Sequence, residues 1–365
     1  MDYDIEKIIP SNYQRAFFFK NLGYLLSDLV NDHYKKRDFL SIYSEGMLGT
    51  YISNAAVEKT LKNGQEIFSS EENFKAFESG FRGIIKECGS YIVKTKKLKH
   101  ATLGDFFDLW AIVRKCYYYF EKTEFFFTDA CYEGEMSETL KNNLLVLGGD
   151  LKEKSRPQLV EILTTMLYHL AGLVAKQHGL DVEDVKAYSF DDIVRLFESD
   201  TKVDRVMILE RQKSYVLYCV DNHVIPIQGK YKAQVIENFK ETDYSGKSEF
   251  KGTIANKGKV TGKARVILAE LDIPYDAFVK KLHAMPMDQG DILVTETTSP
   301  DFVPLMKKAG GIIANQGGLN SHAAIMSREL GVPCLVATYH ATDILKTGDL
   351  IELDANNGIV KILGK

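Results

Sequence analysis

Apolar residues recur every three or four positions through most of the first 240 residues. One segment carries Phe106, Leu109, Trp110 and Val113 at this spacing, and residues 159–170 repeat it. Such a period places the apolar side chains on one face of an α-helix. Prolines, which interrupt helices, are rare between residues 12 and 240. We therefore predict a mostly helical N-terminal domain over residues 1–240.

The pattern changes near the end of this region. Residues 205–211 and 214–220 are rich in β-branched, aliphatic and aromatic residues, with a short polar break between them and Asp221-Asn222 after the second run. Runs of this kind, bounded by turn residues, are typical of a small hairpin or sheet. The polar segment 241–248 that follows predicts a linker that serves as a hinge.

Beyond this segment, strand-length apolar runs alternate with turns marked by glycine. Two helix starts interrupt them, one at Ser299 followed by Pro300 and one at Ser321 followed by His322. The alternation predicts a compact domain of strands and helices over residues 249–365. The whole chain is thus expected to be an α+β protein of more than one domain. The apolar runs are residues 264–268, 291–295, 311–315, 334–338, 350–354 and 359–363.

The second helix start carries the clearest chemical signal in the chain. Ser321 is a good N-cap and Gly331 is a good stop, so His322 takes the first helical position. The free N–H groups and partial positive charge of a helix start favour an anion. Gly317 and Gly318 let the backbone approach that anion closely. The pattern predicts a phosphoryl group on the imidazole; a histidine that only bonds a neighbouring carbonyl is the alternative.

Residues 317–333 resemble the histidine segment of the swivelling phosphohistidine domain in the phosphoenolpyruvate (PEP)-utilising enzymes. That family includes pyruvate phosphate dikinase, phosphoenolpyruvate synthase, rifampicin phosphotransferase and glutamine kinase. The resemblance implies a β/β/α swivelling domain in which His322 carries phosphate between two active sites. Dikinases often have Thr two residues before the histidine, where this chain has Asn320. Upstream segments that match as well are residues 252–262, 290–295 and 297–304.

The same resemblance implies which residues surround the phosphate. Thr297, Thr298 and Ser321 are candidate hydroxyl donors, and Arg328 is a candidate charge partner. Simple helix capping by Ser321 and surface pairing of Arg328 with Glu329 are the ordinary alternatives.

Upstream, a charged group looks like the one that handles the acceptor in relatives such as rifampicin phosphotransferase. It consists of Glu210, Arg211 and Lys213, in the polar break between the two strand-like runs. A charged hairpin tip would carry the same residues, and it is the commoner meaning of such a cluster.

Composition narrows the possible classes of function. The net charge of −4 argues against nucleic acid as the main partner, because binders of the phosphate backbone concentrate positive charge. The first residues do not resemble a signal peptide, and no window approaches about 18 uninterrupted apolar residues, so we expect a cytoplasmic protein without a membrane partner. The 5 cysteines are far apart, which fits reduced thiols and predicts no metal site.

No GxxxxGK[ST] loop occurs, and the first 240 residues are too rich in helix for an ATP-grasp domain. The family resemblance therefore implies the phosphoacceptor subunit of a split dikinase-like phosphotransferase. An ATP-grasp protein on a separate chain would phosphorylate His322 from ATP with Mg²⁺, and His322 would pass the group to a small-molecule acceptor. The competing hypothesis is a non-catalytic, phosphorylatable adaptor or regulatory module that binds a protein partner through its helical domain.

Overall fold

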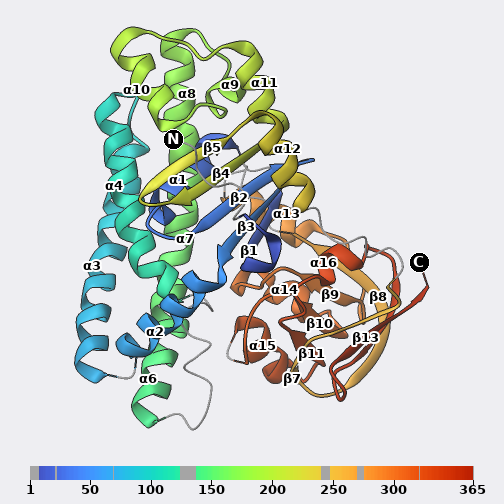
Figure 1. Ribbon diagram of the computed structural model, residues 1–365. Helices are drawn as coiled ribbons and strands as arrows, with labels where there is room; N and C mark the ends of the chain where they lie inside the picture. The colour runs from blue at the N-terminus through green and yellow to red at the C-terminus, as the bar shows by residue number, and fades with distance from the viewer. Residues whose placement is uncertain are drawn as a thin grey trace. The chain divides into compact units, whose positions relative to one another are not determined.

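In a computed structural model, the chain forms two compact units (Figure 1). The first comprises Met1–Phe239 with Leu271–Tyr275, and the second Lys240–Glu270 with Asp276–Lys365. The predicted linker at residues 241–248 falls almost entirely outside the described residues, so its role as a hinge stays a prediction. The structure describes residues 8–20, 23–68, 70–123, 137–239, 247–268, 275–319 and 321–364.

Helices dominate the first unit, as the apolar spacing predicts. The two longest, α3 (Glu71–Thr95) and α4 (Leu103–Phe120), pack against each other. Thr102 starts α4 with a capping box that it completes with Asp105. The other helices are α1 (Tyr24–Tyr34), α2 (Asn54–Phe68), α6 (Glu138–Val146), α7 (Glu153–Glu161), α8 (Leu167–His178), α9 (Val182–Val185), α10 (Phe190–Ser199), α11 (Arg205–Lys213) and α12 (Gly229–Asn238).

The first unit also contains an antiparallel sheet with the strand order β1-β3-β2-β4-β5. Of these strands, only β4 was predicted from the sequence. Asp221 and Asn222 join β4 to β5 with φ angles of 49° and 65°, as a tight hairpin turn requires, so the predicted turn is confirmed. The strands are β1 (Tyr13–Lys20), β2 (Phe39–Ser44), β3 (Met47–Ser53), β4 (Ser214–Val220) and β5 (His223–Ile227).

The prediction of a strand over residues 205–211 is wrong, because α11 occupies those residues. The side chain of Asp204 accepts the N–H of Val206 at 2.8 Å and so caps the helix. Arg211 and Lys213 lie in the last turn, where positive charge favours a helix. The N-cap and the positive charges of the last turn thus outweigh the strand propensity of the run, and Glu210 lies on a helix instead of in a turn.

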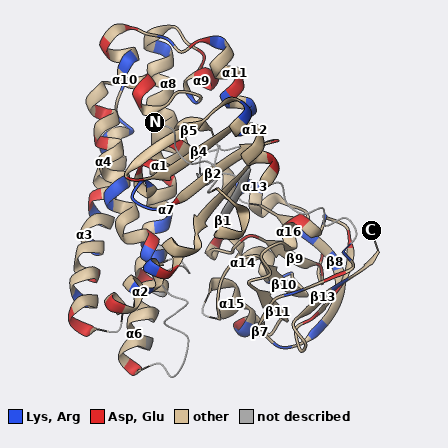
Figure 2. Cartoon of the chain, viewed as in Figure 1, with Lys and Arg blue, Asp and Glu red and all other residues tan. Residues whose placement is uncertain are grey.

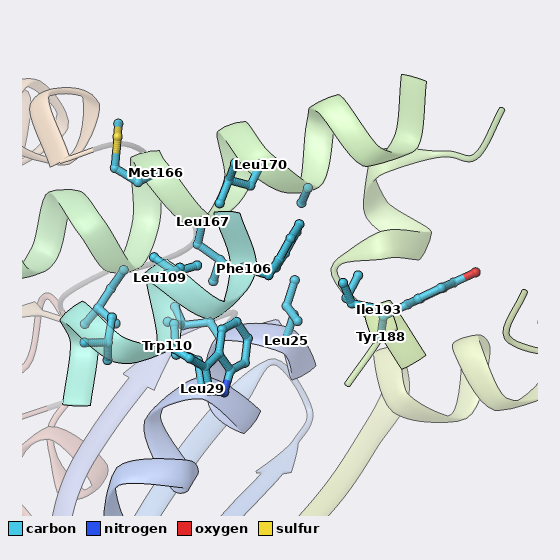
Figure 3. Packing of buried hydrophobic residues seen from close by; sticks show 14 of the residues in the cluster. Leu25, Leu29, Phe106, Leu109, Trp110, Met166, Leu167, Leu170, Tyr188 and Ile193 are labelled. Carbon is cyan, nitrogen blue, oxygen red and sulfur yellow. The ribbon is translucent and has the colours of Figure 1, made fainter. Parts of the chain in front are cut away.

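The main core of the first unit forms where α1, α4, α8 and α10 meet (Figure 3). Burial of each large apolar side chain contributes about 1.5–3 kcal/mol. The helical stretch Asp150–His178 is long and apolar enough to cross a membrane, but 56% of its most apolar window is buried in the structure, as in a core helix. Labelled core residues include Leu25, Leu29, Phe106, Leu109, Trp110, Leu167, Leu170 and Ile193.

Charged residues of both signs are interspersed along the helices of the first unit (Figure 2). Most of their ion pairs are exposed and contribute little to stability, as with Lys75 and Glu71. Glu121 is different, because its side chain is only 3% exposed. Its carboxylate accepts a hydrogen bond from Nη2 of Arg37 at 2.7 Å and lies 2.8 Å from Nε2 of His33.

The second unit is built on a mixed sheet of order β6-β13-β12-β8-β9-β10-β11-β7. Strands β8, β9, β10 and β11 run parallel, and the others pair antiparallel. Parallel neighbours end at the same edge, so the loops after β9, β10 and β11 lie together. The strands are β6 (Glu249–Lys251), β7 (Thr253–Asn256), β8 (Lys259–Ile267), β9 (Ile292–Thr295), β10 (Gly311–Ala314), β11 (Cys334–Val336), β12 (Leu350–Asp354) and β13 (Ile359–Gly364).

All of the strands predicted beyond residue 248 are confirmed, as β8 to β13. The helix predicted from Ser299 is shorter than expected: a 3₁₀ turn, Pro300–Phe302, leads into the single turn α14 (Val303–Met306). Ser299 does not cap it, because its hydroxyl donates to Asp301 at 3.1 Å. Helices α13 (Tyr275–Ala284), α15 (His322–Leu330) and α16 (Ala341–Ile344) complete the unit.

Replacing Glu121 with Gln is predicted to lower the free energy of unfolding of the first unit by about 3 kcal/mol near pH 7, because it leaves Arg37 without its buried counter-charge. Burial raises the pKa of Glu121, but hydrogen bonds and charges from His33 and Arg37 outweigh it and hold that pKa well below its usual range. The stabilisation is therefore present above the unfolded pKa of about 4.3 and is lost as pH falls below it. Urea titrations at several pH values measure the effect.

The exposed pair provides a matched control for this substitution. Glu71→Gln removes the carboxylate partner of Lys75, and because both side chains are exposed it is expected to leave the free energy of unfolding nearly unchanged. Equal effects of the two substitutions would contradict a special role for the buried carboxylate.

Candidate functional site

Helix α15 places His322 at its first position, as the sequence predicts. Oγ of Ser321 accepts the N–H of Ala324 at 3.3 Å, which confirms the N-cap. Gly331 ends the helix with a left-handed φ of 69°, a conformation that glycine adopts without strain. The helix packs against β7, β10 and β11, which fixes its start beside the carboxyl edge of the parallel strands.

The glycine pair before the helix serves the cap. Gly317 has φ of 108°, and a Cβ there would lie 2.7 Å from Cβ of Ser321, too close for any other residue. The carbonyl of Gly318 accepts the N–H of Ser321 at 3.0 Å and closes the turn into the helix. Asn320, at which this chain departs from the dikinases, lies outside the described residues.

A threonine from a different loop reaches the histidine ring. Oγ1 of Thr298 lies 2.9 Å from Nδ1 of His322. Thr298 is 4% exposed and follows β9, whereas His322 follows β10. The hydrogen bond therefore fixes the ring orientation and engages Nδ1. Nε2 is the ring nitrogen that Thr298 does not hold.

Two other candidates do not meet the histidine. The side chain of Thr297 is exposed, and its carbonyl accepts the hydroxyl of Thr295 at 3.1 Å. Arg328 lies six residues along α15 from His322, about 9 Å along the axis at 1.5 Å per residue. Its Nη1 donates to the carbonyl of Ala255 at 3.4 Å, so the structure does not bring Arg328 to the start of the helix.

The charged group upstream is arranged differently from the predicted hairpin tip. Nη1 of Arg211 donates to Oδ2 of Asp192 at 2.5 Å and to the carbonyl of Ala187 at 2.9 Å. Its guanidinium also lies 4.4 Å from the ring centre of Tyr24. Burial raises the pKa of Asp192, but bonds from the Ser189 N–H and Arg211 outweigh it and lower that pKa. Arg211 thus ties α1, α10 and α11 together.

An acceptor-side role for Glu210, Arg211 and Lys213 stays a prediction. Within the residues that the structure describes, no cluster of three or more His, Cys, Asp or Glu side chains is arranged to hold a metal ion.

The sequence interpretation missed a buried polar cluster behind Thr298. Glu296, Asn315 and Thr342 hydrogen bond to one another across the loops after β9, β10 and β11. A signal for them exists in the sequence, because Glu296 and Asn315 are polar residues placed directly after apolar strands. Polar residues at that edge of parallel strands commonly belong to a binding site.

The comparisons with known proteins concern mainly the second unit. Residues 287–358 match the family described as "PEP-utilising enzyme, mobile domain". A probable phosphoenolpyruvate synthase of Archaeoglobus fulgidus is 40% identical over 144 residues, 40% of this chain and 18% of that protein. One of Staphylothermus marinus is 32% identical over 207 residues, 56% of this chain and 22% of that protein. The phosphoenolpyruvate synthase of Pyrococcus furiosus is 56% identical over 72 residues, 20% of this chain and 9% of that protein.

The chain thus spans no more than about a fifth of the length of these curated relatives. Among solved structures, aconitase X of Thermococcus kodakaraensis is 22% identical, with a TM-score of 0.25 over 32% of this chain and 99% of that one. Enzyme I is 12% identical, with a TM-score of 0.21 over 95% and 93%. These two scores are too low to define a shared fold.

The matched residues include β9, the loop with Thr298, the glycine pair and the whole of α15. The family match and the hydrogen-bonded histidine therefore fall on the same segment. Residues 287–358 of this chain are thus similar to the mobile domain of the PEP-utilising enzymes.

Proposed function

We propose that this protein is a phosphoryl carrier that accepts the group on Nε2 of His322. The observation that carries the proposal is the 2.9 Å hydrogen bond between Oγ1 of Thr298 and Nδ1 of His322. It makes the two ring nitrogens different, because Thr298 holds Nδ1, and we assign the reaction to the other nitrogen, Nε2.

The chemistry follows from the tautomer that can attack phosphorus. In that form Nδ1 carries the proton and donates it to Oγ1 of Thr298, while Nε2 holds the lone pair. In-line attack forms the Nε2–P bond as the bond from phosphorus to the donor's leaving group breaks. The imidazole becomes cationic in the product, and the Nδ1–H bond to Thr298 strengthens because its donor gains charge.

The helix start supports the same step electrostatically. A phosphoryl group beside the first residue of α15 meets the positive end of the helix dipole and its free N–H groups. The glycine backbone before Ser321 leaves room for that approach. Each effect favours the phosphorylated state over the unphosphorylated histidine.

We place the phosphoryl donor on another protein. An ATP-grasp domain outside these 365 residues, on a separate chain, is proposed to transfer a phosphoryl group from ATP to His322 and to hold the Mg²⁺ that accompanies the nucleotide. His322 then delivers the group to a small-molecule acceptor bound by the first unit. The family match over the segment that contains His322 supports the role of a phosphoryl carrier, and the cytoplasm, where ATP is available, is the proposed location.

His322 is predicted to be the histidine that becomes phosphorylated. Incubation with phosphoramidate, a small phosphoryl donor that releases ammonia, should add one acid-labile phosphoryl group per chain, detected by intact mass. His322→Ala should abolish the addition, and His283→Ala, a histidine whose ring bonds the carbonyl of Asp301, should leave it unchanged. Undiminished labelling of His322→Ala would rule out this site.

Thr298→Val is predicted to slow phosphorylation about 10-fold, which corresponds to about 1.4 kcal/mol, the order of one hydrogen bond. Thr298→Ser keeps the hydroxyl and should retain most of the rate. Thr297→Val is a matched comparison, since the neighbouring side chain is exposed. Rates come from the time course of the phosphoramidate reaction. If both valine substitutions slowed it equally, the hydrogen bond would lose its assigned role.

The isolated chain is predicted not to bind Mg-ATP tightly, because it has no loop of the kind that cradles nucleotide phosphates. Isothermal titration of the full chain with Mg-ATP tests this. A dissociation constant in the micromolar range would mean that the first unit holds the nucleotide itself, and the proposed partner would then be unnecessary.

A further inference from the structure

Behind the bond between Thr298 and His322, buried polar side chains join the three loops at the carboxyl edge of the parallel strands. Glu296 and Asn315 are 5% and 0% exposed. A carboxylate removed from water has to be satisfied by hydrogen-bond donors of the protein. The donors to Glu296 therefore determine where the loop that carries this residue can lie.

The amide of Asn315 forms the centre of this cluster. Its Nδ2 donates to Oε1 of Glu296, and Oγ1 of Thr342 donates to the same oxygen at 2.6 Å. On its other side, Oδ1 of Asn315 accepts the hydroxyl of Thr338 at 3.2 Å and the N–H of Thr342 at 3.3 Å. Nε2 of Gln316 lies 3.5 Å from the second carboxylate oxygen of Glu296, Oε2.

The backbone repeats the same connections. The N–H of Gln316 donates to the carbonyl of Glu296 at 2.9 Å, and the N–H of Tyr339 donates to the carbonyl of Asn315 at 3.0 Å. Ala337 and Tyr339 have φ angles of 52° and 62°, a left-handed conformation that is strained for residues with a Cβ. Such residues persist where the surroundings determine the backbone strongly, so the three loops form one constrained unit.

We propose that Glu296 is a positioning residue for phosphoryl transfer, a role that rests on the proposed function of His322. It lies two residues before Thr298, and its partner Asn315 lies two residues before Gly317. The carboxylate therefore sets the distance between the loop that supplies the hydroxyl and the loop that leads into the histidine helix. Without it, both loops keep their strands but lose the contact that aligns Oγ1 with Nδ1.

Glu296→Gln is the first test, because it keeps the shape and removes the charge. The new amide nitrogen faces either the two donors to Oε1, Asn315 Nδ2 and Thr342 Oγ1, or Nε2 of Gln316 on the other side, so the loops should shift. Phosphorylation by phosphoramidate is expected to slow about 10- to 100-fold, the order found when reacting groups are misplaced by about 1 Å. The ¹⁵N NMR signals of the His322 ring should change as well, because they report which nitrogen carries the proton.

A reversed pair tests the mechanism. Glu296→Gln combined with Asn315→Asp lets the new glutamine amide donate to the new carboxylate, while Thr338 and Thr342 still donate to that carboxylate. The double variant is expected to recover most of the rate and the original ring signals. Thr342→Val removes one donor to Glu296 without changing charge, and it should shift the same ring signals. This variant replaces Glu296→Gln in the test if the glutamine variant does not fold.

Asp349→Asn is the matched control, since Asp349 is 6% exposed and accepts the N–H of Lys346 at 2.8 Å in a turn before β12. It should lower the melting temperature without changing the rate or the ring signals. A Glu296→Gln protein with wild-type rate and ring signals would overturn the proposal, as would a double variant no better than the single one. Failure of the wild type to accept phosphate would instead count against the proposed function, and the ring signals would still test Glu296.

Discussion

The site depends on the hydrogen bond between Thr298 and Nδ1 of His322, which joins two loops that are separate in the sequence. An imidazole has two similar nitrogens, and a carrier needs the protein to distinguish between them. The protein meets this requirement with a nearly buried hydroxyl, which is less exposed to competition from water than a surface group. The helix cap, the glycine turn and the polar cluster behind the site all serve to bring these two side chains together.

The parallel strands explain why such a contact forms at all. Neighbouring strands β9 and β10 end at the same edge, so a residue three positions after one strand meets the first residue of the helix that follows the other. Gly317 permits the close turn, and Ser321 fixes the start of α15. The polar residues Glu296 and Asn315 replace water beneath the loops with defined hydrogen bonds, and this favours a single arrangement of the edge over many.

Local signals made the second unit largely predictable. Apolar runs between glycines identified its strands, and Ser321 and Gly331 identified the ends of α15, because caps and turns depend on neighbours in sequence. The cluster of Glu296, Asn315 and Thr342 was missed, since it forms only when three strand ends come together. In the first unit, the early strands β1 to β3 lay within a region expected to be helical, and α11 was taken for a strand because its cap at Asp204 was overlooked.

The most direct test of the central claim is to determine which ring nitrogen of His322 carries the phosphate. Full-length protein labelled with ¹⁵N in histidine and phosphorylated with phosphoramidate can be examined by ¹⁵N and ³¹P NMR. We predict that phosphate is attached to Nε2 and that Nδ1 keeps its proton and its bond to Thr298. Phosphate on Nδ1 would contradict the account, because the nitrogen that Thr298 holds would then be the one that reacts.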